Sequence, residues 1–327
     1  MFPGTIIPPL PTKKIMGNLS PDFVEERRLG LQQFLNGIIY HPKLSKSYDL
    51  KTFLSASGDG LEAGKALSER PQPGLLKSMW GGVRSAWRAR TGSAPHPVVA
   101  EIAANDSFKE ISQRLDVYEG HLKKVTSLCE KCVKVDRARG YELARVAAYL
   151  QVMADGAQES PESTTMLRGA GDRFDRVSTV RQDQVDHTVA EFLTPMRYQL
   201  GKIGAVKLVM KNRDKAAVEL QSASDTLHSK KRAVASARAY GNTKGELVGV
   251  QGRAAEAQSG VDEAEARIKQ TEQQVRFISQ NLNKEITKFD FERRRDYREF
   301  MIRHVHSQVE YAAQERQMWE MLRDELR

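Results

Sequence analysis

The chain has 327 residues, of which 40 % are hydrophobic, 28 % charged and 7 % aromatic, and its 51 Lys and Arg against 42 Asp and Glu give a net charge of +9. This balance is typical of long helices with narrow apolar stripes and argues against a compact globule with a thick core. No apolar run approaches the ~18–20 residues of a membrane-spanning helix, and two cysteines are too few for a disulfide framework, so we expect a reducing compartment.

The first 55 residues combine a proline-rich segment with two short helical patterns. Residues 8–11 read PPLP and precede a pair of lysines, and apolar residues at helical spacing recur from 23 to 35 and from 44 to 54. A polyproline ligand for a partner domain is one interpretation of the PPLP segment. Residues 1–90 carry 13 basic and 7 acidic side chains. Most of the excess positive charge therefore lies here, where it suits an anionic surface of either lipid or nucleic acid.

Residues 56–97 are rich in Gly, Ser and Pro and predict a linker, within which about 74–90 form one amphipathic helix. Tryptophans beside cations, flanked by flexible sequence, are typical of a helix that lies in a bilayer interface. The alternative is that the same face packs on the helical bundle as a brace. The residues predicted to insert share one helical face: Leu75, Leu76, Met79, Trp80, Val83 and Trp87.

From residue 98 onward the pattern is almost entirely helical, with breaks near 156–161 and 240–252. Segments of roughly 55–75 residues would form helices on the order of 80–110 Å long, and a lone helix of that length cannot bury its apolar stripe. We therefore expect an elongated three-helix antiparallel coiled-coil bundle, bent where Pro195 removes a backbone donor from the second helix. The predicted seam of the first segment alternates spacings of three and four: Phe108, Ile111, Leu115, Tyr118, Leu122, Val125, Cys129 and Cys132. The second follows the same alternation, with Phe192, Met196, Gln199, Ile203, Val206, Met210, Ala217, Leu220, Ser224, Leu227 and Val234. The third carries Val261, Ile268, Val275, Leu282, Ile286, Phe289 and Phe300, with Tyr311, Met318 and Met321 beyond.

Motifs that carry catalytic or metal chemistry do not occur. Cys129-x-x-Cys132 has no second pair to complete a zinc site, and both residues fall on the predicted seam, which favours packed thiols. His304 and His306 lie on different helix faces, so they do not predict a metal site. Phosphate-loop, nucleophile-elbow and His-Glu-x-x-His patterns are absent. We therefore expect a protein without catalytic residues, metal or cofactor.

The first 55 residues resemble the second half of a PX (phox-homology) domain. The resemblance is carried by the PPLP segment, by FVEERR at 23–28, and by HPxL at 41–44. It implies that Lys13 meets a phosphoinositide phosphate and that Arg27 binds the inositol ring, roles that suit a mobile point charge and a rigid fork. A PX domain begins with a three-stranded sheet that supplies further headgroup contacts, and no such strands precede these motifs. We therefore expect the chain to be a fragment or a truncated gene model.

With the tryptophan helix and three long helices behind these motifs, the whole chain resembles a PX–BAR sorting nexin of the type that works with retromer. The resemblance implies an all-α fold with a partial PX domain in residues 1–55, a linker in 56–97 and a BAR-type three-helix dimerisation domain in 98–327. It also implies a concave basic face toward the membrane. The residues expected on that face are Lys207, Lys211, Arg213, Lys215, Lys230, Lys231 and Arg232.

The leading hypothesis is a cytoplasmic protein, peripheral on endosomal membranes, that dimerises to sense or induce curvature on phosphoinositide-containing bilayers during protein sorting. Its expected partners are a second copy or a related sorting nexin, with retromer subunits as further candidates. A soluble coiled-coil adaptor that acts only through protein–protein interaction is the alternative. Nucleic acid is disfavoured because charge is nearly balanced along the helices and no base-reading motif occurs.

Overall fold

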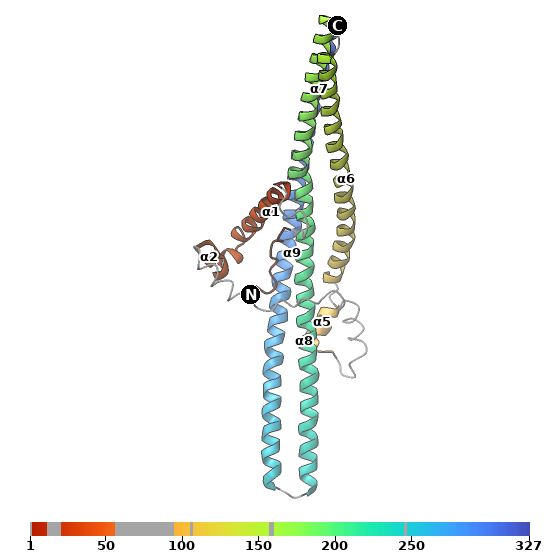
Figure 1. The fold of residues 1–327 in the computed structure, drawn as a ribbon. Coiled ribbons are helices and arrows are strands. Elements are labelled where there is room, and N and C mark those ends of the chain that lie inside the picture. The colour runs from red at the N-terminus through yellow and green to blue at the C-terminus, as the bar shows by residue number, and fades with distance from the viewer. Residues whose placement is uncertain (1, 12–20, 56–94, 105–106, 157–159, 245–246) are drawn as a thin grey trace. The chain divides into compact units, whose positions relative to one another are not determined.

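The computed structural model describes residues 2–11, 21–55, 95–104, 107–156, 160–244 and 247–327 (Figure 1). Within these ranges it contains helices and no strand, which confirms the predicted all-α class. The short elements are α1 (Pro21–Ile39), a 3-10 turn (Leu44–Lys46), α2 (Tyr48–Ser55) and α5 (Pro97–Ala104). The long elements are α6 (Ser107–Gly156), α7 (Pro161–Thr188), α8 (Thr194–Lys244) and α9 (Leu247–Glu325).

The long helices end where the sequence predicts breaks. α6 ends at Gly156 and α8 at Lys244. α7 has Pro161 in its first turn, and the Ser160 hydroxyl accepts the backbone N–H of Ser163 at 3.2 Å. Both features stabilise a helix start, because proline needs no donor there and the hydroxyl satisfies a free N–H. The 79 residues of α9 make a helix about 120 Å long, so the predicted long helical segments are confirmed.

The second long segment changes helix type just before Pro195. Val189–Leu193 form a π-helical turn between α7 and α8, and the Thr194 N–H donates to the Val189 carbonyl. Proline has no N–H and its ring crowds the preceding turn, so a wider turn relieves the clash. This π turn lies just before Pro195, where the sequence predicts a bend, and the chain is helical on both sides of it.

Residues 1–7, 35–112 and 205–286 form the first of two compact units. Within this unit the C-terminal part of α8 and the N-terminal part of α9 run antiparallel and side by side (Figure 1). Leu220, Val275 and Leu282, all predicted seam residues, are fully buried. α5 contributes two valines to the same core, whose members are Val98, Val99, Ala216, Leu220, Val275 and Ile278.

Residues 8–34, 113–204 and 287–327 form the second unit. In this unit α7 contacts both α6 and the C-terminal part of α9. The Ser178 hydroxyl donates to the Gly140 carbonyl on α6 at 3.0 Å, and the rings of Phe174 and Trp319 meet edge to face at 5.1 Å. Aromatic pairs of this geometry add to the energy of burial, so α7 is fixed to a neighbour on each side.

The buried seam of α6 differs from the predicted one. Leu122 is buried as predicted, but Val125 and Cys132 are exposed, and Thr126 and Val133 are buried instead. The prediction is therefore wrong for Val125 and Cys132. A straight α-helix has about 3.6 residues per turn and drifts by about 20° per heptad against a 3.5-residue repeat. A predicted seam that alternates spacings of three and four residues therefore moves off the buried face of the helix after a few turns.

Candidate functional site

Arg213, predicted to face the membrane, is buried among the helices of the first unit. Its side chain is 7 % exposed, and its guanidinium lies 4.1 Å from the centre of the Phe108 ring. It donates to the Ser279 hydroxyl and to Asp214 Oδ1, each at 3.2 Å, and burial lowers its pKa. The prediction is wrong for Arg213 because this residue occupies a seam position, three after Met210, where its planar group stacks on an aromatic ring.

The other predicted membrane-facing cations differ in accessibility. Lys215 and Arg232 are exposed. Lys231 is exposed but forms an ion pair with Glu265 on α9 at 2.7 Å, and Lys230 is partly buried where it donates to a backbone carbonyl of α9 at 2.9 Å. Lys215 and Arg232 are thus the members of this set best placed to meet an anionic surface. Lys207 and Lys211 are partly exposed, and each already makes an interaction within the chain.

Substitutions at Arg213 and Lys215 separate buried from exposed cations. We expect Lys215→Ala to weaken binding to anionic vesicles by about fivefold, because each cation near an anionic bilayer contributes on the order of 1 kcal/mol. Arg213→Met should leave vesicle binding unchanged and alter the free energy of unfolding by less than about 1 kcal/mol, since replacing a buried charge by an apolar side chain is often neutral. Vesicle sedimentation and thermal unfolding measure the two effects. Equal loss of binding in both variants would contradict the assignment.

One of the two predicted phosphoinositide residues lies within the described ranges. Arg27 is on α1 and is partly exposed, and its neighbour Arg28 forms an ion pair with Glu25 at 2.6 Å. Lys13 and the predicted membrane-inserting residues from 75 to 87 lie outside the residues that the structure describes. Lipid contact by these residues stays a prediction.

The proline segment packs against two glycines in the second unit. A Cβ atom on Gly201 of α8 would lie 2.7 Å from Cβ of Pro9, and one on Gly30 of α1 would lie 2.8 Å from Cβ of Pro11. Carbon atoms do not approach so closely without a clash, so the absence of a side chain at each glycine admits the ring. Leu10 between the two prolines is exposed. Because both rings are used within the chain, the segment is less suited to be a polyproline ligand for another domain.

Arg197 of α8 links α1 to α6 in the same unit. Its guanidinium donates to Glu26 Oε1 at 2.5 Å and to Glu130 Oε1 at 2.7 Å. The three side chains are between 25 and 41 % exposed, so solvent screens their attraction in part. Glu26 directly precedes Arg27 in the chain. A residue predicted to bind lipid is therefore adjacent to an ion network anchored on two long helices.

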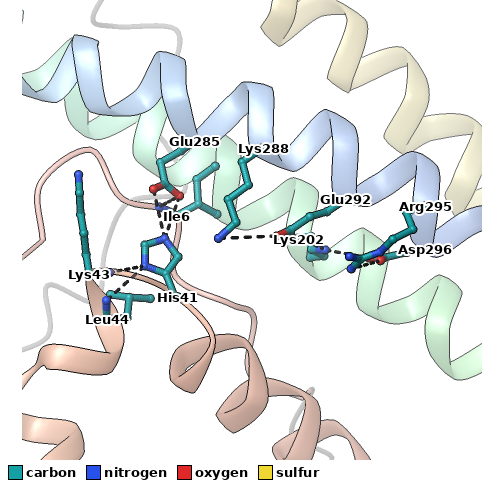
Figure 2. A network of polar contacts seen from close by, with 10 residues as sticks. All are labelled: Ile6, His41, Lys43, Leu44, Lys202, Glu285, Lys288, Glu292, Arg295 and Asp296. Atoms are coloured by element: carbon teal, nitrogen blue, oxygen red, sulfur yellow. Dashed lines mark hydrogen bonds and ion pairs between the residues drawn. The ribbon is translucent and has the colours of Figure 1, made fainter.

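A buried histidine–carboxylate pair joins the loop after α1 to α9 in the first unit. Figure 2 shows His41 with Nε2 facing Glu285, at 3.2 Å from Oε1 and 3.3 Å from Oε2. The backbone N–H groups of Lys43 and Leu44 both donate to His41 Nδ1 at 3.2 Å. Nδ1 is therefore unprotonated, and Nε2 carries the ring hydrogen. Glu285 also accepts the backbone N–H of Ile6 at 3.4 Å, so one carboxylate holds two separate segments.

Polar side chains also lie between α8 and α9 in the second unit. Lys202 of α8 contacts Glu292 at 3.5 Å and Asp296 at 3.0 Å on α9 (Figure 2). One turn earlier on α8, the Gln199 amide donates to Asp296 at 2.9 Å, and Gln199 is buried as its predicted seam position requires. Polar groups buried between helices penalise a shifted pairing, so these contacts fix the register of the two helices.

α6 carries a second apolar stripe, which is exposed. Val135 is 67 % exposed and Leu128 is 60 % exposed, although both are large aliphatic side chains. The members recur at helical spacing and share one face of α6, distinct from the buried seam. Large apolar side chains that recur along one exposed helix face suit an interaction surface. We call this set the outer stripe, and it consists of Val117, Val125, Leu128, Val135, Val146, Tyr149 and Met153.

The two cysteines have different surroundings. Cys129 is partly buried, and burial raises the pKa of its thiol. Cys132 is exposed on the face of the outer stripe. The described residues contain no group of three or more His, Cys, Asp or Glu side chains able to hold a metal ion. Among the same residues, no helix combines the length and the apolar character needed to cross a membrane.

Three of these features were not predicted from the sequence. The outer stripe has a signal, because Leu128 and Val135 follow Val125 at helical spacing and lie outside the single seam that was assigned. The pair of His41 and Glu285 joins positions 244 residues apart, and no local pattern encodes it. The Arg197 network likewise depends on three elements that are distant in the sequence.

Comparisons with known proteins identify families for both parts of the chain. Residues 95–325 match a family model described as Vps5 C terminal like, and residues 1–57 match the PX domain. Sorting nexin 2B of Arabidopsis thaliana is 24 % identical over 372 residues, which cover 100 % of this chain and 63 % of that protein. Sorting nexin-7 of Homo sapiens is 26 % identical over 234 residues, which cover 70 % and 56 %. The chain thus spans about three fifths of the length of the curated relatives it matches.

A solved structure of the SNX-BAR Mvp1 tetramer has a similar fold. Its TM-score is 0.58 at 15 % identity, and the match covers 98 % of this chain and 84 % of that chain. At this identity the likeness concerns the fold alone, and it agrees with the succession of long helices seen here. The family model covers more than half of the chain and lies on those same helices. The chain belongs to the Vps5 C-terminal-like family and is a sorting nexin with PX and BAR domains.

Proposed function

We propose that this sorting nexin is a peripheral membrane protein that dimerises through its long helices and senses or induces curvature on phosphoinositide-containing endosomal membranes during protein sorting. Its partners are anionic lipid, a second chain of its own or a related kind, and retromer subunits at the cytoplasmic face. It acts as a scaffold and not by catalysis. The division into a PX region (1–55), a linker (56–97) and a BAR domain (98–327) is part of this proposal.

The outer stripe of α6 is the observation that carries the proposal. Its side chains are between 42 and 67 % exposed and follow one helix face from residue 117 to residue 153. Removing apolar surface from water is favourable by about 25 cal/mol per Å², so a second chain that covers the stripe gains several kcal/mol. A heptad-like stripe on a long helix suits another helix of the same kind, which makes a second BAR domain the expected occupant.

Membrane contact is divided among several weak elements in this proposal. Lys215 and Arg232 supply exposed cations in the first unit, and Arg27 supplies a guanidinium fork for a headgroup. The tryptophan helix of the linker adds apolar anchoring. Each contact alone is marginal, so pairing two chains raises the apparent affinity by presenting every element twice.

Vesicle sedimentation with two lipid compositions tests the lipid part of the proposal. One vesicle contains phosphatidylcholine and phosphatidylinositol 3-phosphate, and the other replaces the phosphoinositide by phosphatidylserine at equal surface charge. We expect tighter binding to the vesicle that contains the phosphoinositide. Arg27→Ala should weaken binding to this vesicle by about fivefold, because one cation is lost at the headgroup. Arg28→Ala is the matched control, because this neighbour is exposed and paired with Glu25. Equal binding to both vesicles, or binding to neither, would contradict the proposal, and the second result favours the soluble adaptor.

A further inference from the structure

We propose that one turn of α8, from Arg197 to Gly201, positions Arg27 for contact with a lipid headgroup. The inference rests on the proposed function, since it gives a long helix of the BAR region a part in the lipid binding assigned to Arg27. Arg197 and Gly201 are four residues apart on α8 and therefore share one helix face. α1, which carries Arg27, and the proline segment both contact that face in the second unit.

The first contact is the ion network around Arg197. Its Nη1 donates to Glu26 of α1 at 2.5 Å, while Nε and Nη2 donate to Glu130 of α6 at 3.2 and 2.7 Å. A guanidinium is planar and its N–H groups have fixed directions, so holding Glu130 on one edge fixes where Glu26 can sit. Successive residues on a helix are about 100° apart. Fixing Glu26 therefore limits rotation of α1 about its axis and sets the direction in which Arg27 lies.

The second contact is made by the proline segment. Pro9 lies against Gly201 of α8, and Pro11 lies against Gly30 of α1, each so closely that a Cβ atom on the glycine would be within 2.8 Å of the ring. The proline rings restrict the backbone between them. The segment is thus a stiff spacer between α8 and α1, and its length determines how close the two helices come.

The two contacts have matching spacing on both helices. On α1 they are made by Glu26 and Gly30, and on α8 by Arg197 and Gly201. Each pair is four residues apart, so on each helix one face carries both contacts. Two contacts about 6 Å apart along a helix fix its direction as well as its rotation. Arg27 lies next to this face, where it is partly exposed.

A pair of glycine substitutions on α8 separates positioning from general damage to the helix. Gly201→Val places a side chain where Pro9 lies, whereas a Cβ on Gly204 meets nothing within 4 Å, so Gly204→Val is the matched control. We expect Gly201→Val to weaken binding to phosphatidylinositol 3-phosphate vesicles by about fivefold, as Arg27→Ala does. Binding to phosphatidylserine vesicles of equal charge, and the mass of the assembly in solution, should not change in either variant.

Combining substitutions tests whether Arg197 acts through Arg27. Arg197→Gln should cost about the same affinity for the phosphoinositide vesicle as Arg27→Ala. The double variant should bind no more weakly than Arg27→Ala alone, because a positioning residue has nothing left to position. If the two losses multiply, Arg197 acts on binding independently and the inference is wrong.

Hydrogen exchange of α1 gives a readout without lipid. We expect faster exchange of residues 23–34 in Gly201→Val than in Gly204→Val, and equal exchange in the two variants would overturn the inference. A further result would overturn the positioning role and leave the proposed headgroup binding intact. In that result the unaltered chain prefers the phosphoinositide vesicle, Arg27→Ala removes that preference, and Gly201→Val binds this vesicle as Gly204→Val does. If the unaltered chain shows no preference, the proposed headgroup binding is wrong and the positioning role fails with it.

Discussion

A chain with Leu128→Glu and Val135→Glu is expected to have the mass of a monomer at concentrations at which the unaltered chain is a dimer. Both residues lie on the outer stripe and are 60 and 67 % exposed, so neither supports the fold of the single chain. In a dimer that covers the stripe, each added carboxylate would be removed from water without a partner. That costs on the order of 3–5 kcal/mol, and the dissociation constant should rise by more than about a hundredfold.

Light scattering across a concentration series measures this change in mass. Ser127→Glu with Lys134→Glu is the matched control, because both residues are exposed and each lies one position from a stripe residue on a different face of α6. The control should remain a dimer, and both double variants should keep the helicity of the unaltered chain. A dimer mass that persists in the Leu128 and Val135 variant would show that the outer stripe is not the contact.

Cys132 offers an independent check of the same surface. Its thiol is exposed in the single chain and lies on the face of the outer stripe, while Cys129 is partly buried. If a second chain covers this face, maleimide labelling of Cys132 should slow as the protein concentration passes through the dimer dissociation constant. Labelling at a rate independent of concentration would place Cys132 outside the contact.

The long helices could be predicted from the sequence because their signals are local. The break near 156–161 contains a glycine and a proline, the break near 240–252 contains four glycines, and α6 and α8 end at Gly156 and Lys244. Seam residues such as Leu220 and Leu282 are fully buried because the seams on α8 and α9 repeat at regular spacing. These features depend on neighbouring residues in one helix, which is the information that a single sequence contains most directly.

The errors arose where burial depends on another element. Arg213 fits both a seam position and a basic surface cluster, and only its contact with Phe108 on α6 decides in favour of burial. On α6 itself the helix carries two apolar faces. The predicted alternation is buried at Phe108, Leu115 and Leu122 and then passes to Val125 on the exposed face. Sequence spacing shows that a face is apolar but not whether the same chain covers it.

The contacts made by the PX region could not be predicted because they are distant in the sequence. Glu26 contacts Arg197 across 171 residues, and His41 contacts Glu285 across 244. The sequence motifs named Lys13 and Arg27 as headgroup residues, and those assignments stay predictions. The structure adds the side chains of α8 and α9 that hold the backbone of the PX region in place. No motif of the PX region itself contains those side chains.

Glu285→Ala is expected to release the loop after α1, and with it the N-terminal segment, from α9. The Glu285 carboxylate accepts from His41 Nε2 and from the backbone N–H of Ile6, and the His41 side chain is 6 % exposed. Without the carboxylate, the buried His41 donor would be unpaired and the part-buried Ile6 N–H would lose its partner. A buried unpaired donor costs about 1–3 kcal/mol and a part-buried one costs less, so we expect the contact to weaken by on the order of 2–4 kcal/mol.

A neighbouring glycine gives a second way to disturb the same contact. Gly4 has a φ of 79°, and a Cβ atom there would lie 2.7 Å from the carbonyl oxygen of Ile278 on α9. Both the left-handed backbone and the close approach disfavour any side chain. The Asn281 amide also donates to the Pro3 carbonyl at 3.2 Å, so the N-terminal segment is held at more than one point. Gly4→Ala should release this segment while leaving the His41 and Glu285 pair in place.

Hydrogen exchange of residues 41–50 distinguishes these variants. Glu285→Ala should expose the amides of Lys43 and Leu44, which donate to His41 Nδ1, while Gly4→Ala should leave them protected. Glu263→Ala, an exposed glutamate on the same helix, is the control and should change neither. In His41→Asn the shorter side chain can still accept a backbone N–H but cannot reach α9. Its effect should therefore not add to that of Glu285→Ala, because the two side chains form one interaction. Additive losses would mean that His41 and Glu285 stabilise the loop separately.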